Sequence, residues 1–470
     1  MALPLLSADW VREPAVAGLF YPSDPVELRD TVAGHVEAAV PADPPSPPKA
    51  LIAPHAGYRY SGATAGAAYR SVAGRRGDVD RVVLVGPAHR VPVDGVGVTT
   101  ARAWRTPLGE VPVDVDVCRD LVDGGDAVAA DAAHRPEHSL EVHLPFLLEV
   151  LGPVAIVPLV VGRCPARAVA DVLARTWGDD RTLVVVSSDL SHYLSDAAAR
   201  GRDDRTRLAI IEGRGDDIGP EDACGHLPIC GLLLAAHDHD VTPCTLAVAT
   251  SADTSGDAER VVGYGSFGFG PPRPLTEAEG RTLVARARAA IAHELATHEP
   301  DPLADDDVPE RLRQPAATFV TLERAGELTG CIGSLAATRP LWRDVCLNAR
   351  GAAFTDPRFP PLVAEDFDRT VVKVSLLSGL SPLPGDREAL IAALRPGVDG
   401  VVLESADRRG TFLPQVWGKV PAPDRFVDQL VGKAGLEDPG WPADARVWRY
   451  TTDEFSEDGW PSTATRRAQA

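Results

Sequence analysis

Three apolar runs in the first half of the chain each end on a side chain that can bind a metal or move a proton. The run ALIAPH ends at His55, RVVLVGPAH ends at His89, and TLVVVSSDLSH carries Asp189 and then His192. Imidazole and carboxylate groups serve both as metal ligands and as general acids or bases. A single strand-end histidine is more often a structural or surface group, so the interpretation rests on the three runs together.

Two further segments add candidate ligands. EHSLEVHLPFL carries His138, Glu141 and His143 ahead of an apolar helix, and the three-residue spacing predicts that His138 and Glu141 share a helix face. DACGHLPICG offers Cys224 and His226 beside glycine. A thiolate with two imidazoles suits Fe(II), Zn(II) or Cu, whereas Mg(II) and Ca(II) prefer oxygen ligands. The sequence therefore predicts a transition-metal site.

The elements that position these groups are short runs rich in β-branched residues. Because they show no alternation of apolar and polar residues, they are typical of strands buried on both faces. In chain order they are ALIAPH, RVVLVGP, VAIVPLVV, TLVVVSSD, TLAVAT and VVGYGSFGF, with helices expected at 62–73, 139–151 and 165–176. This rhythm predicts a layered α/β domain over residues 1–270 with a mostly parallel sheet. Ligands of such sheets collect outside the carboxyl ends of the strands, so we expect one shared polar site there.

A break rich in glycine and proline, FGFGPPRP at 267–274, separates a second, smaller domain that we place at 275–465. Thr276 is a good N-cap for the helix that follows it. The strand candidates are ATFVTLE, LTGCIGSL, TVVKVSLLS and GVVLES, and helices are expected near 340–352, 386–395 and 424–435. This mixture of elements predicts an α+β fold.

Two features of the second domain could carry chemistry. Gly330 and Gly333 flank Cys331 and Ile332 in a predicted strand. A small buried thiol is the simpler interpretation of Cys331, and a nucleophile is the alternative. No histidine follows His298, so a cysteine–histidine pair would need a residue from the start of the domain. Asp356 and Arg358 predict an ion pair that fixes a loop, with an anion site as the alternative.

Composition limits the class of protein. The 470 residues carry a net charge of −20 and 44% hydrophobic residues, which is typical of a soluble globular protein and argues against broad nucleic-acid binding. No uninterrupted apolar window reaches the roughly 18 residues of a membrane span. The start, MALPLLSADWVREP, lacks the basic leader of a secretion signal. Seven dispersed cysteines without a CxxC pair favour a reducing cytoplasm.

The motifs of the first domain resemble a known family. APHAGYRYSG, VGPAHR, EHSLEVHLPFL, SSDLSHY and CGHLPI resemble, in order and spacing, the motifs of the Memo family over residues of about 10–270. The resemblance implies a fold similar to the class III extradiol-type non-haem iron dioxygenases. It also implies a metal held by His55, His89 and Cys224, with iron as the expected metal and copper or zinc as alternatives.

The same resemblance implies roles for four more residues. Asp189 and His192 would line the site, with His192 in the place of the acid/base histidine of the dioxygenases, and Glu141 and His143 would support the metal ligands. The third ligand is a thiol where the dioxygenases have a carboxylate. A thiolate is softer and can be oxidised, so redox chemistry or plain metal binding is expected at least as readily as ring cleavage.

The second domain resembles the AMMECR1 family over residues 275–465, through LTGCIG, NARGAAFTDPRFPPL and GVVLESADRRGTFLPQVW. Thr329 stands where that family has an arginine, so a contact made by that arginine would be lost here. Proteins similar to the two domains accompany a radical-SAM protein in the AmmeMemoRadiSam system, and the resemblance implies such a partner. The chain lacks the CxxxCxxC motif of the radical enzyme itself.

Three functional hypotheses follow. The leading one is a cytoplasmic, metal-binding and redox-active component of an AmmeMemoRadiSam-type system. The second is a metal-dependent hydrolase in which His192 is the general base. The third is a non-catalytic scaffold that binds a peptide or protein partner. The substrate, small molecule or peptide, is left open, and neither a membrane nor a nucleic acid is expected as a partner.

Overall fold

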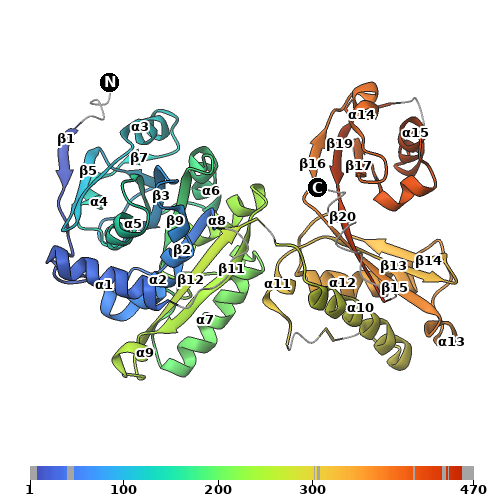
Figure 1. Ribbon diagram of the computed structural model, residues 1–470, viewed down its shortest axis with the longest axis horizontal. Coiled ribbons are helices and arrows are strands. Elements are labelled where there is room, and N and C mark those ends of the chain that lie inside the picture. Colours follow the sequence, from blue (N-terminus) through green and yellow to red (C-terminus); the bar gives the residue numbers. More distant parts are fainter. Residues whose placement is uncertain are drawn as a thin grey trace. The chain divides into compact units, whose positions relative to one another are not determined.

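The computed structural model describes residues 8–39, 47–271, 273–300, 302–303, 307–405, 408–436, 441–442 and 444–457. The chain forms two compact units, Met1–Arg273 and Pro274–Ala470 (Figure 1). The first seven residues of the N-terminal stretch, most of the proline-rich segment 41–48 and the end of the expected second domain lie outside the described residues.

A mixed sheet of nine strands forms the centre of the first unit, in the order β10-β12-β2-β9-β3-β8-β4-β7, with β11 paired to β12. The four central strands are parallel: β2 (Ala50–Ala53), β9 (Thr182–Ser187), β3 (Arg81–Pro87) and β8 (Ala155–Val161). The flanking strands are β4 (Val96–Val98), β7 (Val128–Ala129), β10 (His192–Leu194), β11 (Thr242–Thr250) and β12 (Val261–Gly270).

The expectation of a mostly parallel sheet is therefore right for the centre and wrong for the flanks. β12 runs antiparallel to β2, and β4 runs antiparallel to β8. The physical reason on one side is the connection: β11 and β12 are joined through the short helix α9 (Ala252–Ser255), and such a short link returns the chain antiparallel. A parallel pair needs a longer crossover.

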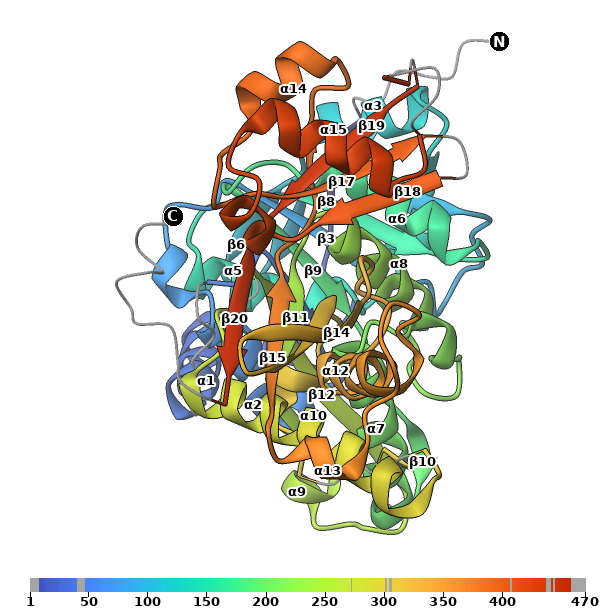
Figure 2. The same ribbon diagram turned by 90° about the vertical axis from the view of Figure 1, so that its right-hand side faces the viewer.

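Helices cover both faces of this sheet (Figure 2). On one side α1 (Pro25–Ala38), α2 (Tyr58–Arg70) and α5 (Leu144–Val150) pack together, and on the other α6 (Ala166–Thr176) packs on α8 (His226–Asp238). The valine-rich central strands are buried between these layers, as their unbroken apolar runs predict. The other helices of the unit are α3 (Val115–Asp123), α4 (Asp131–His134) and α7 (Asp196–Ile211).

A separate three-stranded sheet lies at the N-terminal end of the first unit. β1 (Ala8–Arg12) pairs in parallel with β5 (Ala101–Thr106), which pairs antiparallel with β6 (Gly109–Pro112). The sequence analysis does not predict this sheet, because its strands are short and carry charged residues. It matters for the site because β1 carries Arg12, whose buried side chain reaches the segment that holds His138.

The second unit contains two four-stranded antiparallel sheets. The first has the order β14-β13-β15-β20 and the second β16-β19-β17-β18. Their bounds are β13 (Thr318–Arg324), β14 (Glu327–Gly333), β15 (Thr370–Leu377), β16 (Ser381–Leu383), β17 (Gly400–Ser405), β18 (Arg408–Phe412), β19 (Arg446–Tyr450) and β20 (Thr452–Ser456).

The helices of the second unit are α10 (Glu277–Thr297), α11 (Glu310–Arg313), α12 (Leu341–Arg350), α13 (Ala364–Phe367), α14 (Arg387–Ala393) and α15 (Pro423–Lys433). Thr276 caps α10 through a capping box with Glu279, as the sequence predicts. One packing prediction is wrong: Cys331 lies on β14 but is half-buried. It pairs with Thr321 on β13. The residues on either side of Thr321, Val320 and Leu322, point into the core with α10 and α12, so Cys331 faces away from that core.

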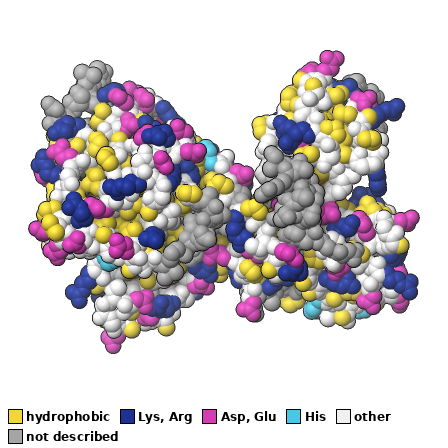
Figure 3. Space-filling view, in the orientation of Figure 1, with side chains coloured by type: hydrophobic (Ala, Val, Ile, Leu, Met, Phe, Trp, Pro, Cys, Tyr) yellow, Lys and Arg dark blue, Asp and Glu magenta, His cyan; other side chains and the backbone are white. Residues whose placement is uncertain are grey.

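No helix among the described residues is both long enough and apolar enough to cross a membrane. Basic and acidic side chains are interspersed over the face drawn in Figure 3, so the charge of that face is mixed rather than of one sign.

Candidate metal centre

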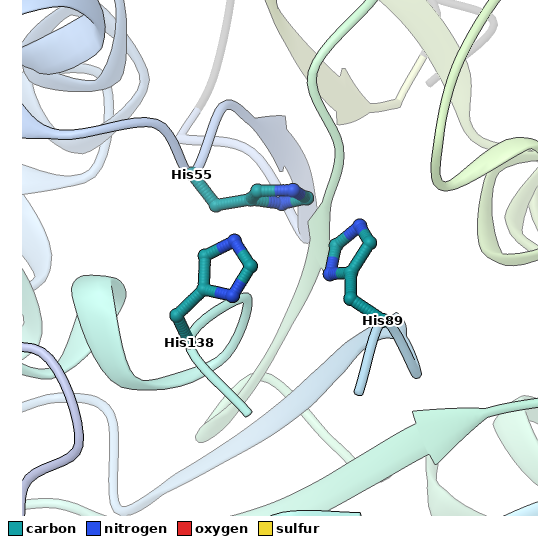
Figure 4. Close-up of side chains that lie close together, drawn as sticks. All are labelled: His55, His89 and His138. Atoms are coloured by element: carbon teal, nitrogen blue, oxygen red, sulfur yellow. The ribbon is translucent and has the colours of Figure 1, made fainter. Parts of the chain in front are cut away.

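Three histidine side chains from separate segments of the first unit meet beside the carboxyl ends of the central strands (Figure 4). His55 follows β2, His89 follows β3, and His138 lies in a loop just ahead of a 3₁₀ turn. One ring nitrogen from each lies within 4.8 Å of those of the others. The ring centroids are 5.1, 5.5 and 4.9 Å apart. The structure thus brings His55 and His89 together in the way that the strand-end argument predicts.

The hydrogen bonds of His55 determine which of its nitrogens is free. Its Nδ1 lies 2.7 Å from Oγ of Ser187, the last residue of β9. That hydroxyl donates its only proton to the carbonyl oxygen of Ser139 at 2.6 Å, so it accepts from the imidazole. His55 therefore carries a proton on Nδ1, and the lone pair on Nε2 is available to a metal. Burial, together with the neighbouring histidines, holds the pKa of His55 well below its usual value.

His143 contacts the same serine from the other side. Its Nε2 lies 2.9 Å from Ser187 Oγ and donates to it, while its Nδ1 accepts from the hydroxyl of Tyr69 at 2.9 Å. Burial lowers the pKa of His143 to about 3, so the ring is neutral. His143 thus lies one hydrogen-bonded residue away from His55, a position from which it supports that ring through Ser187.

A buried carboxylate orients His89. Glu137 accepts from the backbone N–H of His89 at 2.6 Å and from its Nδ1 at 3.0 Å, and it accepts further from the backbone N–H groups of His138 and Ser139. Burial alone would raise the pKa of Glu137, but these hydrogen bonds outweigh it and lower the pKa to about 2. With Nδ1–H donated to this carboxylate, Nε2 is the nitrogen of His89 that remains for a metal.

His138 contributes the third imidazole. Its Nδ1 lies 3.2 Å from Oε1 of Glu137, but it is buried and makes no hydrogen bond among the described residues. The edge of its ring packs against Phe20, with ring centroids 5.0 Å apart. Burial lowers the pKa of His138 to about 4, against the opposing charge of Glu137. A neutral imidazole with an unsatisfied nitrogen, next to two other imidazoles, is what a cation site would require.

Cys224 brings its sulfur to the same place. Its Sγ lies 3.4 Å from Nε2 of His55. Gly225 makes this approach possible, because a side chain there would have its Cβ only 2.7 Å from the carbonyl oxygen of Ser187 and from Cβ of Ser188. Burial, and then the charge of Asp189, raise the pKa of Cys224 to about 12. The sulfur is therefore a thiol until a cation displaces its proton.

Asp189 and His192 lie beside the histidines and not within the group of three. Oδ1 of Asp189 accepts from the backbone N–H groups of His55 and Ala56 at 2.8 and 3.3 Å, and so fixes the loop that carries His55. Burial raises the pKa of Asp189 to about 6, against the His55 hydrogen bond and the charge of His192. His192, half-buried at the start of β10, is close enough to act electrostatically on His55, Asp189 and the buried Asp203.

Glu141 acts elsewhere. Its carboxylate accepts from Arg12 at 2.7 Å, from the hydroxyl of Tyr21 at 2.7 Å and from the backbone N–H groups of Ala15 and Val16. The structure therefore assigns it to holding the N-terminal segment and not to the metal ligands themselves. The expected shared helix face with His138 is wrong, because the helical turn begins only at Glu141 and His138 precedes it in a loop.

The donor set fits a transition metal. It offers three imidazoles, two of them with Nδ1 committed to a hydrogen bond, and one thiol. A sulfur and a nitrogen bound to one tetrahedral ion at the usual bond lengths are roughly 3.5 Å apart, close to the separation of Cys224 and His55. Hard cations such as Mg(II) and Ca(II) would find no matching set of oxygens in these residues.

Sequence reasoning missed three contributors to this arrangement. His138 was noted as a candidate but not assigned as a ligand, and Glu137 and Ser187 were not singled out. The only signal for Glu137 and His138 was their position in PEHSLEVH, next to residues that had been selected. Ser187 looked like the polar end of a buried strand, and its role appears only when three distant segments are brought together.

Comparisons with known proteins agree on two parts of the chain. A family model described as Memo-like protein matches residues 12–268, and one described as AMMECR1 matches residues 284–455. A "MEMO1 family protein" of Sulfolobus acidocaldarius is 36% identical over 284 residues, which cover 55% of this chain and 99% of the relative. A protein of the same description from Methanopyrus kandleri is 35% identical over 281 residues, or 55% of this chain and 98% of that one.

Two further matches cover a smaller share of the chain. A chain from Methanothermobacter thermautotrophicus, described only as a protein, is 41% identical over 194 residues, covering 40% of this chain and 98% of the relative. The crystal structure of an uncharacterised protein from Pyrococcus horikoshii is 32% identical and covers 39% of this chain and 94% of its own, with a TM-score of 0.37.

Proposed function

Since the chain belongs to the Memo-like protein family and carries an AMMECR1 domain after that part, we propose that it is a cytoplasmic, redox-active metal-binding component of an AmmeMemoRadiSam-type system. The observation that carries the proposal is the meeting of three imidazoles and one thiol from four separate segments of the first unit. Such a convergence of imidazole nitrogens, each oriented or left unpaired, has no structural need that packing alone would explain.

His55 and His89 are the central ligands in this proposal. Both have Nδ1 committed to a hydrogen bond, which leaves Nε2 as the ligand atom. Cys224 and His138 complete the set, one through a sulfur already at ligand distance from the His55 nitrogen and one through a third imidazole. Iron is the metal that we propose, with copper as the alternative, because mixed imidazole and thiolate ligands suit both.

The metal would supply a redox centre or a Lewis acid, and this chain's residues would hold and tune it. The thiol favours redox chemistry, because a thiolate donates charge to the metal and can itself be oxidised. Asp189 holds the His55 loop, and His192 stands beside it as the group able to move a proton at the edge of the site. A fold related to the class III extradiol dioxygenases is part of the same proposal, supported by histidines that follow two parallel strands, β2 and β3, on either side of β9.

The test is metal analysis of the full chain purified anaerobically without added metal. Wild-type protein should retain close to one equivalent of iron or copper, and His55→Ala, His89→Ala and Cys224→Ser should each lose most of it. His138→Ala distinguishes a four-ligand set from the three-ligand set that the sequence suggested. His237→Ala, which changes an exposed histidine of α8, is the matched control and should keep its metal. Unchanged metal content in all four site variants would overturn the proposal.

A hydrolase remains the alternative because one observation favours it. Three imidazoles around one position are also the ligand set of catalytic zinc sites that activate water. In that case His192 would be the general base. Native zinc in place of iron or copper, and metal content that survives Cys224→Ser, would favour this function over the redox one.

A further inference from the structure

The second unit holds a cysteine whose surroundings differ from those of the other thiols. Burial raises the pKa of Cys118 to about 12 and that of Cys230 to about 11, and it also raises the pKa of Cys164. Cys331 is half-buried on β14, on the sheet face opposite the α10–α12 core. Reactive cysteines are found in partly exposed, electropositive surroundings, whereas buried ones are inert.

An ion pair clamps the backbone on both sides of this thiol. Asp356 accepts from the backbone N–H of Cys331 at 2.8 Å, and Arg358 donates to its carbonyl oxygen at 2.8 Å. Arg358 also binds Asp356 through two nitrogens, at 2.7 and 2.9 Å. The expected loop-fixing ion pair is confirmed. The guanidinium that binds this carbonyl oxygen also acts electrostatically on the Cys331 side chain.

The flanking glycines explain how β14 comes so close to its neighbours. A side chain at Gly330 would have its Cβ 2.2 Å from the carbonyl oxygen of Ala352, and one at Gly333 would meet the ring of Phe319 at 2.3 Å. These approaches require glycine. They bring the Cys331 segment against the turn Gly351–Thr355, which leads directly to Asp356.

A second cation lies on α15, the helix that packs on β18 of the unit's other sheet. Lys433, the last residue of α15, lies with its ammonium 5.0 Å from the ring centre of Phe412. Within the part of the chain that the structure describes, no carboxylate forms an ion pair with it. Burial lowers the pKa of Lys433, the charge of Arg358 lowers it further, and Cys331 acts in the opposite direction. The Thr321 hydroxyl lies 3.5 Å from the sulfur and can donate to it.

We infer that Cys331, Arg358 and Lys433 form a nucleophilic thiol site that takes anionic electrophiles, of the class of a carbonyl compound bearing a carboxylate or phosphate. The Arg358 charge is largely met by Asp356, so Lys433 supplies the attraction for the anion, while the sulfur attacks the carbonyl carbon. In this reversible addition a sulfur–carbon bond forms, the carbonyl π bond breaks and the thiol proton ends on the oxygen. No oxidant or co-reactant is needed. The site is independent of the metal centre.

The experiment compares two alkylating agents of nearly equal size, anionic iodoacetate and neutral iodoacetamide, on the folded full chain. Each forms a sulfur–carbon bond, releases iodide and leaves the thiol proton to the solvent. Peptide mass spectrometry gives the rate at each cysteine. The iodoacetate-to-iodoacetamide rate ratio at Cys331 should exceed that at Cys164, which is also partly exposed, by about fivefold. Lys433→Gln should lower the ratio at Cys331 to that of Cys164.

Two variants serve as controls. Lys433→Arg keeps the charge and should keep the ratio, and Lys419→Gln removes an exposed lysine of the same unit and should change nothing.

Glyoxylate, an anionic aldehyde, should protect Cys331 from iodoacetamide at lower concentration than neutral glycolaldehyde does. A ratio unchanged in Lys433→Gln, equal protection by the two aldehydes, or slower alkylation of Cys331 than of Cys164 by both reagents would each overturn the inference.

Discussion

Two arginine–carboxylate pairs hold the segments next to the two candidate sites, and they differ in how far water reaches them. Arg12 and Glu141 are 1% and 0% exposed, and they join the N-terminal segment to the turn that follows His138. Arg358 and Asp356 are 50% and 2% exposed, and they clamp Cys331. The chemistry of the two pairs is the same. The difference lies in the solvation of the arginine.

The difference suggests what each pair is for. A buried pair is costly to desolvate and is kept only with complete hydrogen bonding, which Arg12 achieves through Glu141 and the carbonyl oxygens of His134 and Glu137. It commits the segment to one position and leaves no face for a ligand. The half-exposed Arg358 fixes a backbone while its charge still borders solvent beside a thiol. The Arg12–Glu141 pair supports the segment next to the metal centre without facing a ligand, whereas Arg358 borders the space beside the Cys331 thiol.

The largest expected effect separates the two pairs by stability. Arg12→Ala should lower the free energy of unfolding of the first unit by about 3–5 kcal/mol, because it leaves the Glu141 carboxylate buried without its counter-charge. Arg358→Ala should cost the second unit only about 1 kcal/mol, since the arginine is half-exposed. Urea unfolding followed separately for the two units measures both values. Equal costs would show that exposure is not what distinguishes the pairs.

The units should also differ in their response to acid. Burial lowers the pKa of His134, which packs beside Arg12, from 6.5 to about 4. Between these values the unfolded chain binds a proton that the folded one excludes, so the first unit should lose up to about 3 kcal/mol as the pH falls from 6.5 to 4. The Arg358 hydrogen bond lowers the pKa of Asp356 to about 2. The contribution of the Asp356 carboxylate to the free energy of unfolding of the second unit should be present above pH 3.8 and lost only below that value.

Unfolding midpoints of both units at pH 7, 5 and 4 test this order. His134→Gln should make the first unit's pH dependence shallower, while His237→Gln, at an exposed position, should leave it unchanged. If the second unit loses stability first on acidification, or if His134→Gln keeps the wild-type slope, the contrast between the buried and the half-exposed network does not hold.

The central strands and two of the site histidines could be predicted because the information is local. Unbroken valine-rich runs indicate buried parallel strands, and the residue after such a run lies at the edge of the sheet where ligands collect. His55 and His89 follow directly from this. The antiparallel flanks, in contrast, depend on which strand pairs with which across the whole unit, and apolar runs carry no such information.

The supporting network could not be predicted because its bonds join distant segments. Arg12 and Glu141 are 129 residues apart, and Ser187 joins His55 to His143 over 132 and 44 residues. Glu141 was selected for its neighbours in sequence, yet its carboxylate points to the N-terminal segment. Short polar motifs therefore identified the right neighbourhood, while the role of each residue was set by tertiary contacts.

Ser187 offers the next contrast, because it acts on the metal centre alone. Ser187→Ala removes the acceptor that fixes the His55 proton on Nδ1 and leaves two buried imidazole donors unpaired. Metal affinity should fall by about 10–100-fold, while the alkylation ratio at Cys331 should not change. Competition with a chromophoric chelator measures the metal affinity. Ser187→Thr keeps the hydroxyl and should recover part of the affinity, whereas Ser71→Ala, which changes the half-buried C-cap of α2, should have no effect on it.

A purely structural role for Ser187 would give a different result. In that case Ser187→Ala would lower the free energy of unfolding without changing the affinity of the folded protein for metal. Nitrogen NMR of the His55 ring adds an independent measure, because loss of the acceptor should let the proton exchange between Nδ1 and Nε2. An unchanged tautomer in the alanine variant would remove the argument that the serine selects Nε2 as the ligand atom.

The smallest expected effect concerns the hydroxyl beside Cys331. Thr321→Val keeps the shape of the side chain and removes the donor 3.5 Å from the sulfur. Thr321 is half-buried on a paired strand, so stability should change by no more than about 0.5 kcal/mol. Alkylation of Cys331 should slow by about twofold with both reagents, because a neutral donor stabilises the thiolate but does not select by charge. A change in the iodoacetate-to-iodoacetamide ratio would instead mean that the threonine, and not Lys433, governs the recognition of the anion.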